Sequence, residues 1–234
     1  MATMTQHTLK QFDVELEEIR RGVLQMGGLV ETQVARALEG LASGDLALLD
    51  AVTAGDKEVN LAQIKLDDEC SRLIARRQPA ATDLRFVLSA IKAVADLERI
   101  GDEAKKIAKA ARRLHSADVP FTPRVGLSQS AQLVLEMLRT ALDGFARADA
   151  SHAQEIKLKD AEVDTQFKGT MRQLITYMME DPRTITSSLE TLFIAKSIER
   201  IGDHAMNVAE HVVYMVSGED VRFENTQAVL GGKH

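Results

Sequence analysis

The sequence predicts an all-α protein in which six long antiparallel helices form two pseudo-symmetric three-helix bundles in tandem. Two observations support this fold class. Apolar residues recur at intervals of three and four positions through long stretches, and no segment shows the two-residue alternation of a strand. Blocks of similar sequence also occur twice in the same order, about a hundred residues apart, which indicates an internal repeat.

The composition fits packed helices. Hydrophobic residues make up 45% of the 234 residues, which is enough for one large domain or two small ones. Aromatic residues are only 4% and tryptophan is absent, so aliphatic side chains must fill the core. The net charge of −6 argues against a nucleic-acid-binding protein, which normally presents a basic surface.

Helix-stop signals divide the chain into segments. Gly44 separates the first helix from the second, and Gln78-Pro79 separates the second from the third, because proline cannot continue a helix. The stretch SADVPFTPRVG, residues 116–126, is the most loop-like part of the chain and joins its two halves. Pro182 precedes the last helix as Pro79 precedes the third. We expect helices at residues 9–42, 46–77, 80–115, 124–147, 149–180 and 183–217.

The internal repeat supports the last three helices as copies of the first three. ALEGLASGD matches ALDGFARAD, and DKEVN matches DAEVD, both at an offset of 104 residues. ERIGD occurs twice at an offset of 101, so the register changes only near the proline turn, where a short insertion costs little. Helices joined by short connections pack antiparallel. We therefore expect a first repeat over residues 1–117, a second over 118–218 and an irregular tail over 219–234.

The sequence favours a cytoplasmic protein. Cys70 is the only cysteine, which excludes a disulfide framework and a cysteine-based zinc site and indicates a buried thiol in a reducing compartment. No apolar run approaches the roughly 18 residues that span a bilayer. The first residues, MATMTQHTLKQFDVELEEIRR, are too polar and acidic for a signal peptide.

The two ERIGD segments place carboxylates where apolar side chains are expected. On a helical wheel, Glu98 and Asp102 continue the apolar stripe of the third helix, whereas Arg99 points to one side. Glu199 and Asp203 have the same placement in the sixth helix. A carboxylate at an apolar interface is costly unless it is paired or bound to metal. On spacing alone two interpretations stay open: a metal site, or a scaffold whose acids contact only nearby lysines and arginines.

The middle helix of each repeat carries further candidate ligands at four-residue spacing: Asp56, Asn60, Asp160 and Asp164. Carboxylates that project inward from neighbouring helices hold iron, manganese or zinc in helical bundles. A set rich in oxygen and without cysteine favours harder cations, magnesium among them. His204 lies about 140° round the helix from Glu199, so we expect no ligand role for it.

Several blocks together resemble the PhoU family of bacterial phosphate-transport accessory proteins. They are the two ERIGD segments, MGGLVE at 26–31, RRQPAATDLR at 76–85 and RQLITYMMEDPRTI at 172–185. The resemblance runs from about residue 9 to residue 223. It implies two similar three-helix bundles that carry multinuclear iron or zinc clusters, one at Glu98 and Asp102 and the other at Glu199 and Asp203. Asn60 replaces the acid found at Asp164, so the first cluster is expected to bind metal more weakly.

The resemblance also implies a regulator and not an enzyme. PhoU-like proteins repress the phosphate-starvation response when phosphate is plentiful and modulate phosphate uptake. They link the ATPase subunit of the phosphate ABC transporter to the membrane sensor histidine kinase, reach the membrane only through these partners, and often form homodimers. The alternative is a helical carboxylate di-metal oxidoreductase, whose usual Glu-x-x-His pairs are absent from this sequence.

Overall fold

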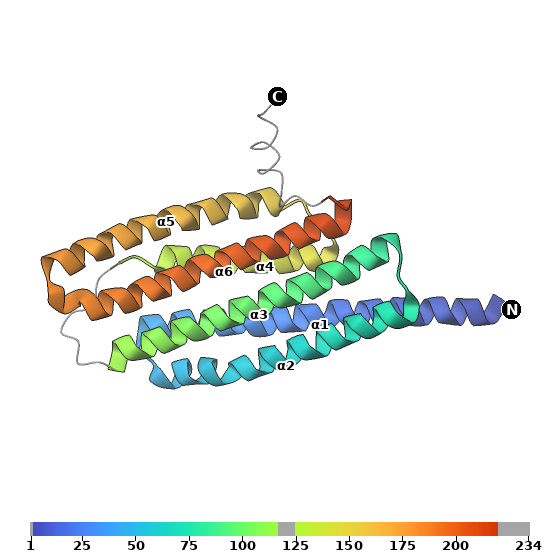
Figure 1. Cartoon of the computed structure of the whole chain (residues 1–234), viewed down its shortest axis with the longest axis horizontal. Coiled ribbons are helices and arrows are strands. Elements are labelled where there is room, and N and C mark those ends of the chain that lie inside the picture. The colour runs from blue at the N-terminus through green and yellow to red at the C-terminus, as the bar shows by residue number, and fades with distance from the viewer. Residues whose placement is uncertain (1, 117–124, 220–234) are drawn as a thin grey trace, which may run out of the picture.

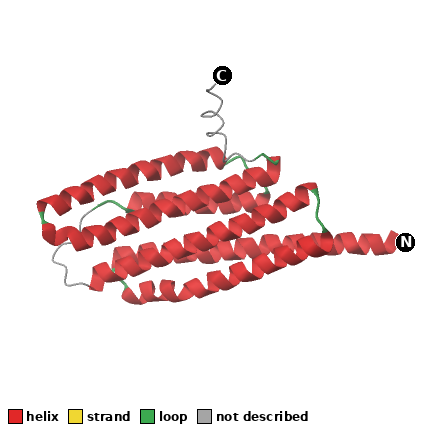
Figure 2. Ribbon diagram, in the orientation of Figure 1, coloured by secondary structure: helices red, strands yellow, loops and turns green. Residues whose placement is uncertain are grey.

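The computed structural model describes residues 2–116 and 125–219, with the backbone alone for residues 2–10. Over these residues the chain is helical and contains no strand, as Figure 2 shows, so the predicted all-α class is confirmed. The elements are α1 (Ala2–Ser43), α2 (Leu46–Arg77), α3 (Ala81–Ser116), α4 (Ser128–Arg147), α5 (Ala153–Glu180), a 3₁₀ helix η1 (Pro182–Thr184) and α6 (Ile185–Ser217).

The helices form two three-helix bundles that share one long interface. α1, α2 and α3 contact one another, as do α4, α5 and α6. α3 lies beside α6 in the middle of the molecule, α1 contacts α4, and α2 and α5 lie at opposite edges (Figure 1). The predicted boundary at 117/118 and nearly all of the predicted tail at 219–234 lie outside the described residues. No helix among those described combines the length and the apolar character needed to cross a membrane.

Local capping explains where the first helices end. Gly44 has a φ of 74° and donates its backbone N–H to Gly40 O at 2.9 Å, which closes α1 with a left-handed residue. The Asp45 side chain then accepts a hydrogen bond from Leu48 N at 3.1 Å and caps the start of α2. Gln78 is also left-handed, with a φ of 48°, directly before Pro79. The predicted breaks at Gly44 and at Gln78-Pro79 are therefore confirmed.

Four helices start more than one residue away from the predicted position, and short polar turns explain two of these differences. α5 begins at 153 and not at 149, since the Asp149 carboxylate accepts a hydrogen bond from Ser151 N at 2.9 Å and forms a turn. α6 begins at 185, because Asp181 accepts from Arg183 N at 3.0 Å and starts η1 instead. α4 begins at 128, and α1 extends back to residue 2, where no glycine or proline stops it.

The core is aliphatic, as the composition predicts. Its largest fully buried side chains are mostly isoleucine, leucine and methionine, with Phe145 as the one aromatic residue among them. Within MGGLVE, Gly27 marks a close approach of α1 to α4, because a Cβ there would lie 2.5 Å from Leu142 Cδ2. A Cβ at Gly28 would meet no such neighbour within 4 Å, so only one of the two glycines serves this crossing.

A buried polar cluster joins the two bundles. The Asp96 carboxylate on α3 accepts hydrogen bonds from three side chains of α6: His204 Nδ1 at 2.8 Å, His211 Nε2 at 2.8 Å and Asn207 Nδ2 at 3.0 Å. Burial alone would raise the pKa of Asp96, but these hydrogen bonds outweigh it and hold the pKa at about 2. The acid is therefore a charged acceptor that satisfies three donors of the neighbouring repeat.

Two ion pairs reinforce the same junction. The Glu103 side chain on α3 is only 3% exposed and lies 3.2 Å from Arg200 Nε on α6. Nearer the end of α3, Arg113 donates two hydrogen bonds of 2.7 Å to the carboxylate of Glu190. Charged groups from α3 and α6 therefore neutralise each other along the interface, and this fixes the register between the helices.

We predict that Asp96→Ala lowers the free energy of unfolding by about 2–4 kcal/mol at pH 7, because it leaves the donors of buried His211 and of half-buried His204 and Asn207 unpaired. The stability that Asp96 provides is fully present above its ordinary pKa near 4 and is lost as the pH falls towards 2, since its folded pKa is depressed. Denaturant titrations at pH 7 and pH 3 measure both effects.

Asp143→Ala is the matched control for this experiment. Asp143 pairs with Arg147 on the surface, and its side chain is 69% exposed. Its removal should change stability by less than about 0.5 kcal/mol. Equal unfolding midpoints for the two variants would contradict a structural role for the Asp96 cluster.

Candidate metal centre

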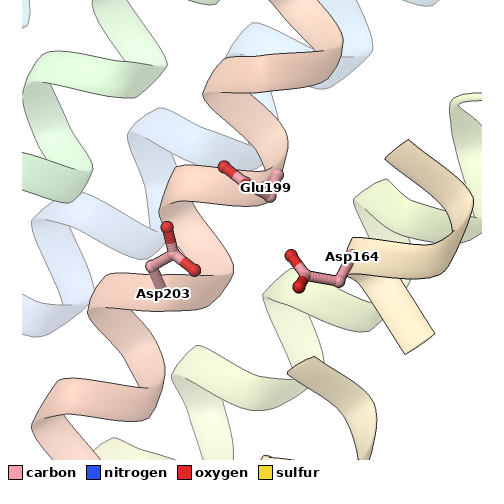
Figure 3. A group of neighbouring side chains, drawn as sticks. All are labelled: Asp164, Glu199 and Asp203. Carbon is pink, nitrogen blue, oxygen red and sulfur yellow. The ribbon is translucent and has the colours of Figure 1, made fainter. Parts of the chain in front are cut away.

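Three acids of the second repeat converge. Asp164 on α5 and Glu199 and Asp203 on α6 each offer a carboxylate oxygen, and these oxygens lie within 4.8 Å of one another. Figure 3 shows Glu199 and Asp203 on successive turns of one helix, with Asp164 facing them from the neighbouring helix. Glu199 is buried, Asp164 is half-buried and Asp203 is exposed, so the group opens to solvent at one side.

The local sequence explains this convergence. The four-residue spacing of ERIGD places Glu199 and Asp203 one above the other on α6. Gly202 lies between them in sequence and leaves room for a fourth acid, because a Cβ at this position would lie 3.4 Å from Asp160 Oδ1. The other neighbours of a Cβ at this position would be side chains of α4, Val134 and Met137. All four second-repeat candidates therefore gather around one turn of α6.

Burial, together with the charge of neighbouring acids, raises the pKa values of Asp160 and Asp203. Burial raises the pKa of Asp160 to about 6, with further contributions from Asp203, Asp164 and Glu199. Burial also raises the pKa of Asp203, followed by the charge of Glu199. The chain therefore holds carboxylates here at a cost in free energy, and a bound cation would offset that cost.

The donor set fits a divalent metal ion. It consists of carboxylate oxygens only, which magnesium and manganese prefer, and its open side leaves room for water ligands. Two lysines partly neutralise the acids at the surface: Lys196 Nζ lies 2.5 Å from both Glu199 oxygens, and Lys168 Nζ lies 3.7 Å from Asp164. Their side chains are 48% and 61% exposed, so either ammonium group can reach solvent, and a bound cation would then replace Lys196 as the partner of the buried Glu199. His204 takes no part, because its ring faces Asp96.

The first-repeat candidates are arranged differently. Asp56, with a side chain only 5% exposed, forms an ion pair with Lys105, whose Nζ lies 2.6 Å from Asp56 Oδ2 and 3.9 Å from Asp102 Oδ1. Asn60 donates its amide to the same Asp56 oxygen at 3.4 Å. Burial raises the pKa of Glu98, followed by the charge of Asp102. Within residues 11–116 and 125–219, the three acids whose carboxylate oxygens come within 4.8 Å of one another are those of the second repeat.

The central place of Lys105 was not predicted. In the sequence it is one of several lysines and arginines near the acids, whereas the structure places its ammonium group between Asp56 of α2 and Asp102 of α3. The available signal was the spacing of Asp102 and Lys105, which are three residues apart and so share one face of the helix.

Comparisons with known proteins agree over almost the whole chain. The PhoU domain model matches residues 23–111 and again residues 127–212. A phosphate-specific transport system accessory protein PhoU homolog from Pseudomonas putida is 46% identical over 222 residues, which cover 94% of this chain and 86% of that protein. The Escherichia coli (strain K12) phosphate-specific transport system accessory protein PhoU is 43% identical over 234 residues, covering 98% and 96%.

Solved structures show the same fold. The crystal structure of PhoU from Pseudomonas aeruginosa superposes with a TM-score of 0.85 at 45% identity and covers 89% of this chain and 100% of that one. The phosphate transport system regulatory protein PhoU from Streptococcus pneumoniae gives a TM-score of 0.83 at 33% identity, covering 90% and 99%. The chain is therefore similar to these proteins in sequence, length and fold.

We predict that Asp160→Asn stabilises the metal-free protein at pH 7.5 by about 1 kcal/mol, after allowance for solvent screening. The folded pKa of Asp160 lies above its ordinary value, so ionisation costs stability as the pH rises from about 4 through 6. The gain should therefore shrink at pH 4.5, which denaturant titrations with a chelator present at both pH values can measure.

Asp50→Asn is the control, because Asp50 is 58% exposed and pairs with Arg112 at the surface. It should not stabilise the protein at either pH. A stabilisation by Asp160→Asn that is the same at pH 4.5 and 7.5 would show that charge repulsion is not its cause.

Proposed function

The chain belongs to the PhoU family, and from this we propose that it is a negative regulator of the phosphate-starvation response that also modulates phosphate uptake. The observation that carries this proposal is the similarity along nearly the full length of relatives named phosphate-specific transport system accessory proteins. Both repeats take part in it, because the PhoU domain model matches each of them.

The proposed mode of action is that of an adaptor. We propose that the protein contacts the ATPase subunit of the phosphate ABC transporter and the sensor histidine kinase of the phosphate two-component system, in the cytoplasm and as a homodimer. The name of the Streptococcus pneumoniae neighbour, a phosphate transport system regulatory protein, supports a regulatory role. The same names, accessory and regulatory, favour this role over the di-metal oxidoreductase.

A metal ion in the second repeat would support this role structurally. Asp164 would hold it from α5, and Glu199 and Asp203 would hold it from α6. When bound, such an ion supplies positive charge that offsets the repulsion among these acids and ties the two helices together. Glu199 and Asp203 fix the α6 side of the site, because both rise from one rigid helix and Glu199 is buried.

We predict that deleting the gene from its bacterium raises alkaline phosphatase activity in phosphate-rich medium at least tenfold, because the starvation response is no longer repressed. Expression of the wild-type chain should restore repression, and the double variant Asp164→Asn with Asp203→Asn tests whether the metal centre is needed for it. Unchanged alkaline phosphatase activity after deletion would count decisively against the proposed function.

We further predict that protein purified without a chelator carries a divalent metal, and that Asp164→Asn with Asp203→Asn lowers the bound metal at least tenfold. The substitutions keep the size of the side chains and remove two anionic ligands. Metal analysis by mass spectrometry measures the content directly.

A double variant with the same charge change, Asp50→Asn with Asp143→Asn, controls for net charge. Both of these acids are exposed and pair with surface arginines. Equal metal content in the two double variants and the wild type would remove Asp164 and Asp203 from the site.

A further inference from the structure

The two copies of the acid motif differ in charge one turn after the motif. The first copy continues as ERIGDEAKK and the second as ERIGDHAMN, so Lys105 corresponds to Met206 at the offset of 101 residues. On the middle helices, Asn60 corresponds to Asp164. The first repeat has therefore exchanged one carboxylate for an amide and one thioether for an ammonium group.

The ammonium group of Lys105 lies among the first-repeat acids. Its Nζ is 2.6 Å from Asp56 Oδ2 and 3.9 Å from Asp102 Oδ1, so a side chain of α3 joins the acid of α2 to the motif acid. The Lys105 side chain is 27% exposed and that of Asp56 only 5%. The ion pair is thus largely withdrawn from solvent, where an opposite charge is worth more than at the surface.

The Lys105 ammonium uses the oxygens that a metal ion would need. Asp56 Oδ2 already accepts from Lys105 and from the Asn60 amide. A dication among these acids would lie beside a positive charge and could bind only after Lys105 had left a partly buried ion pair. The first-repeat acids therefore do not fit a metal ion as they stand.

In the described part of the second repeat, no lysine joins metal-centre acids of two helices as Lys105 joins the acids of the first repeat. Met206 carries no charge at the position of Lys105, and Asp164, Glu199 and Asp203 bring three oxygens within 4.8 Å. Lys196 does contact Glu199, but it precedes the motif in the sequence, whereas Lys105 follows it. The residue that corresponds to Lys196 in the first repeat is Ala95. The Lys196 side chain is 48% exposed and contacts one acid of the site, whereas Lys105 contacts two.

We propose that Lys105 is a built-in cation that replaces a metal ion in the first repeat, so that this chain takes up divalent metal at the second repeat alone. The inference rests on the metal centre proposed above for the second repeat. It assigns different chemistry to two copies of one motif: an internal ion pair of Lys105 with Asp56 and Asp102 in the first repeat, and an exchangeable ion at Glu199 and Asp203 in the second.

Exchanging the two side chains tests the proposal without removing any ligand. In a Mn²⁺ titration followed by calorimetry and by electron paramagnetic resonance, the wild-type chain should bind metal at the second repeat alone. Met206→Lys should weaken this binding at least tenfold. Lys105→Met should add a second class of bound Mn²⁺, which Glu98→Gln with Asp102→Asn in the same chain then removes.

Lys65→Met is the control with the same charge change. The Lys65 side chain is 74% exposed and pairs with Glu69, so this variant should bind Mn²⁺ as the wild type does.

A second variant covers loss of stability in Lys105→Met, which leaves the buried Asp56 without its partner. Lys105→Gln keeps an N–H donor for Asp56 and removes only the charge. It should also gain Mn²⁺ binding, and its melting temperature should rise with Mn²⁺ by more than that of the wild type.

The outcomes separate the two proposals. If wild-type chain loses bound Mn²⁺ when Glu98 and Asp102 are replaced, or if Met206→Lys binds Mn²⁺ normally, the role of Lys105 is overturned while the metal centre stands. If neither the wild type nor the two Lys105 variants bind Mn²⁺, the metal centre of the proposed function fails as well.

Discussion

The packing of α3 against α6 is the interaction on which the rest of the molecule depends. Each helix is the third of its repeat and carries one ERIGD motif, so one interface fixes the position of both acid groups. Apolar burial is non-directional and specifies the register of the two helices less sharply than polar contacts do. The Asp96 carboxylate specifies the register sharply, because all three of its hydrogen bonds to side chains of α6 can form in only one register.

The two repeats share one fold but differ in the polar side chains near their acid motifs. The helices and the motif glycines recur in both halves, yet the side chains near the motifs do not. Glu103 pairs with Arg200 across the junction, while His204, its counterpart at an offset of 101, pairs with Asp96. Tandem repeats tolerate this divergence, because the core positions that hold the fold are separate from the few polar positions that set the chemistry.

The fold could be predicted from the sequence because apolar period and proline position are local properties of the chain. Helix starts at 149 and 183 were misplaced, since an Asx turn at Asp149 and another at Asp181 compete with the first helical turn. The gathering of Asp160, Asp164, Glu199 and Asp203 followed from the repeat and the helical wheel. The Asp96 cluster and the contact of Lys105 with Asp56 did not, because both depend on which helix lies opposite, and the periodicity of a single helix does not show that.

The ammonium group of Lys105 is covalently part of the chain, and this has a consequence for how each half responds to its surroundings. A tethered group keeps a fixed effective concentration at its partners, whatever the cell supplies. A dissolved ion obeys mass action, and its occupancy follows its free concentration. The first repeat therefore keeps one charge balance in every growth condition, whereas the charge balance at Asp164, Glu199 and Asp203 is open to the composition of the solution around it.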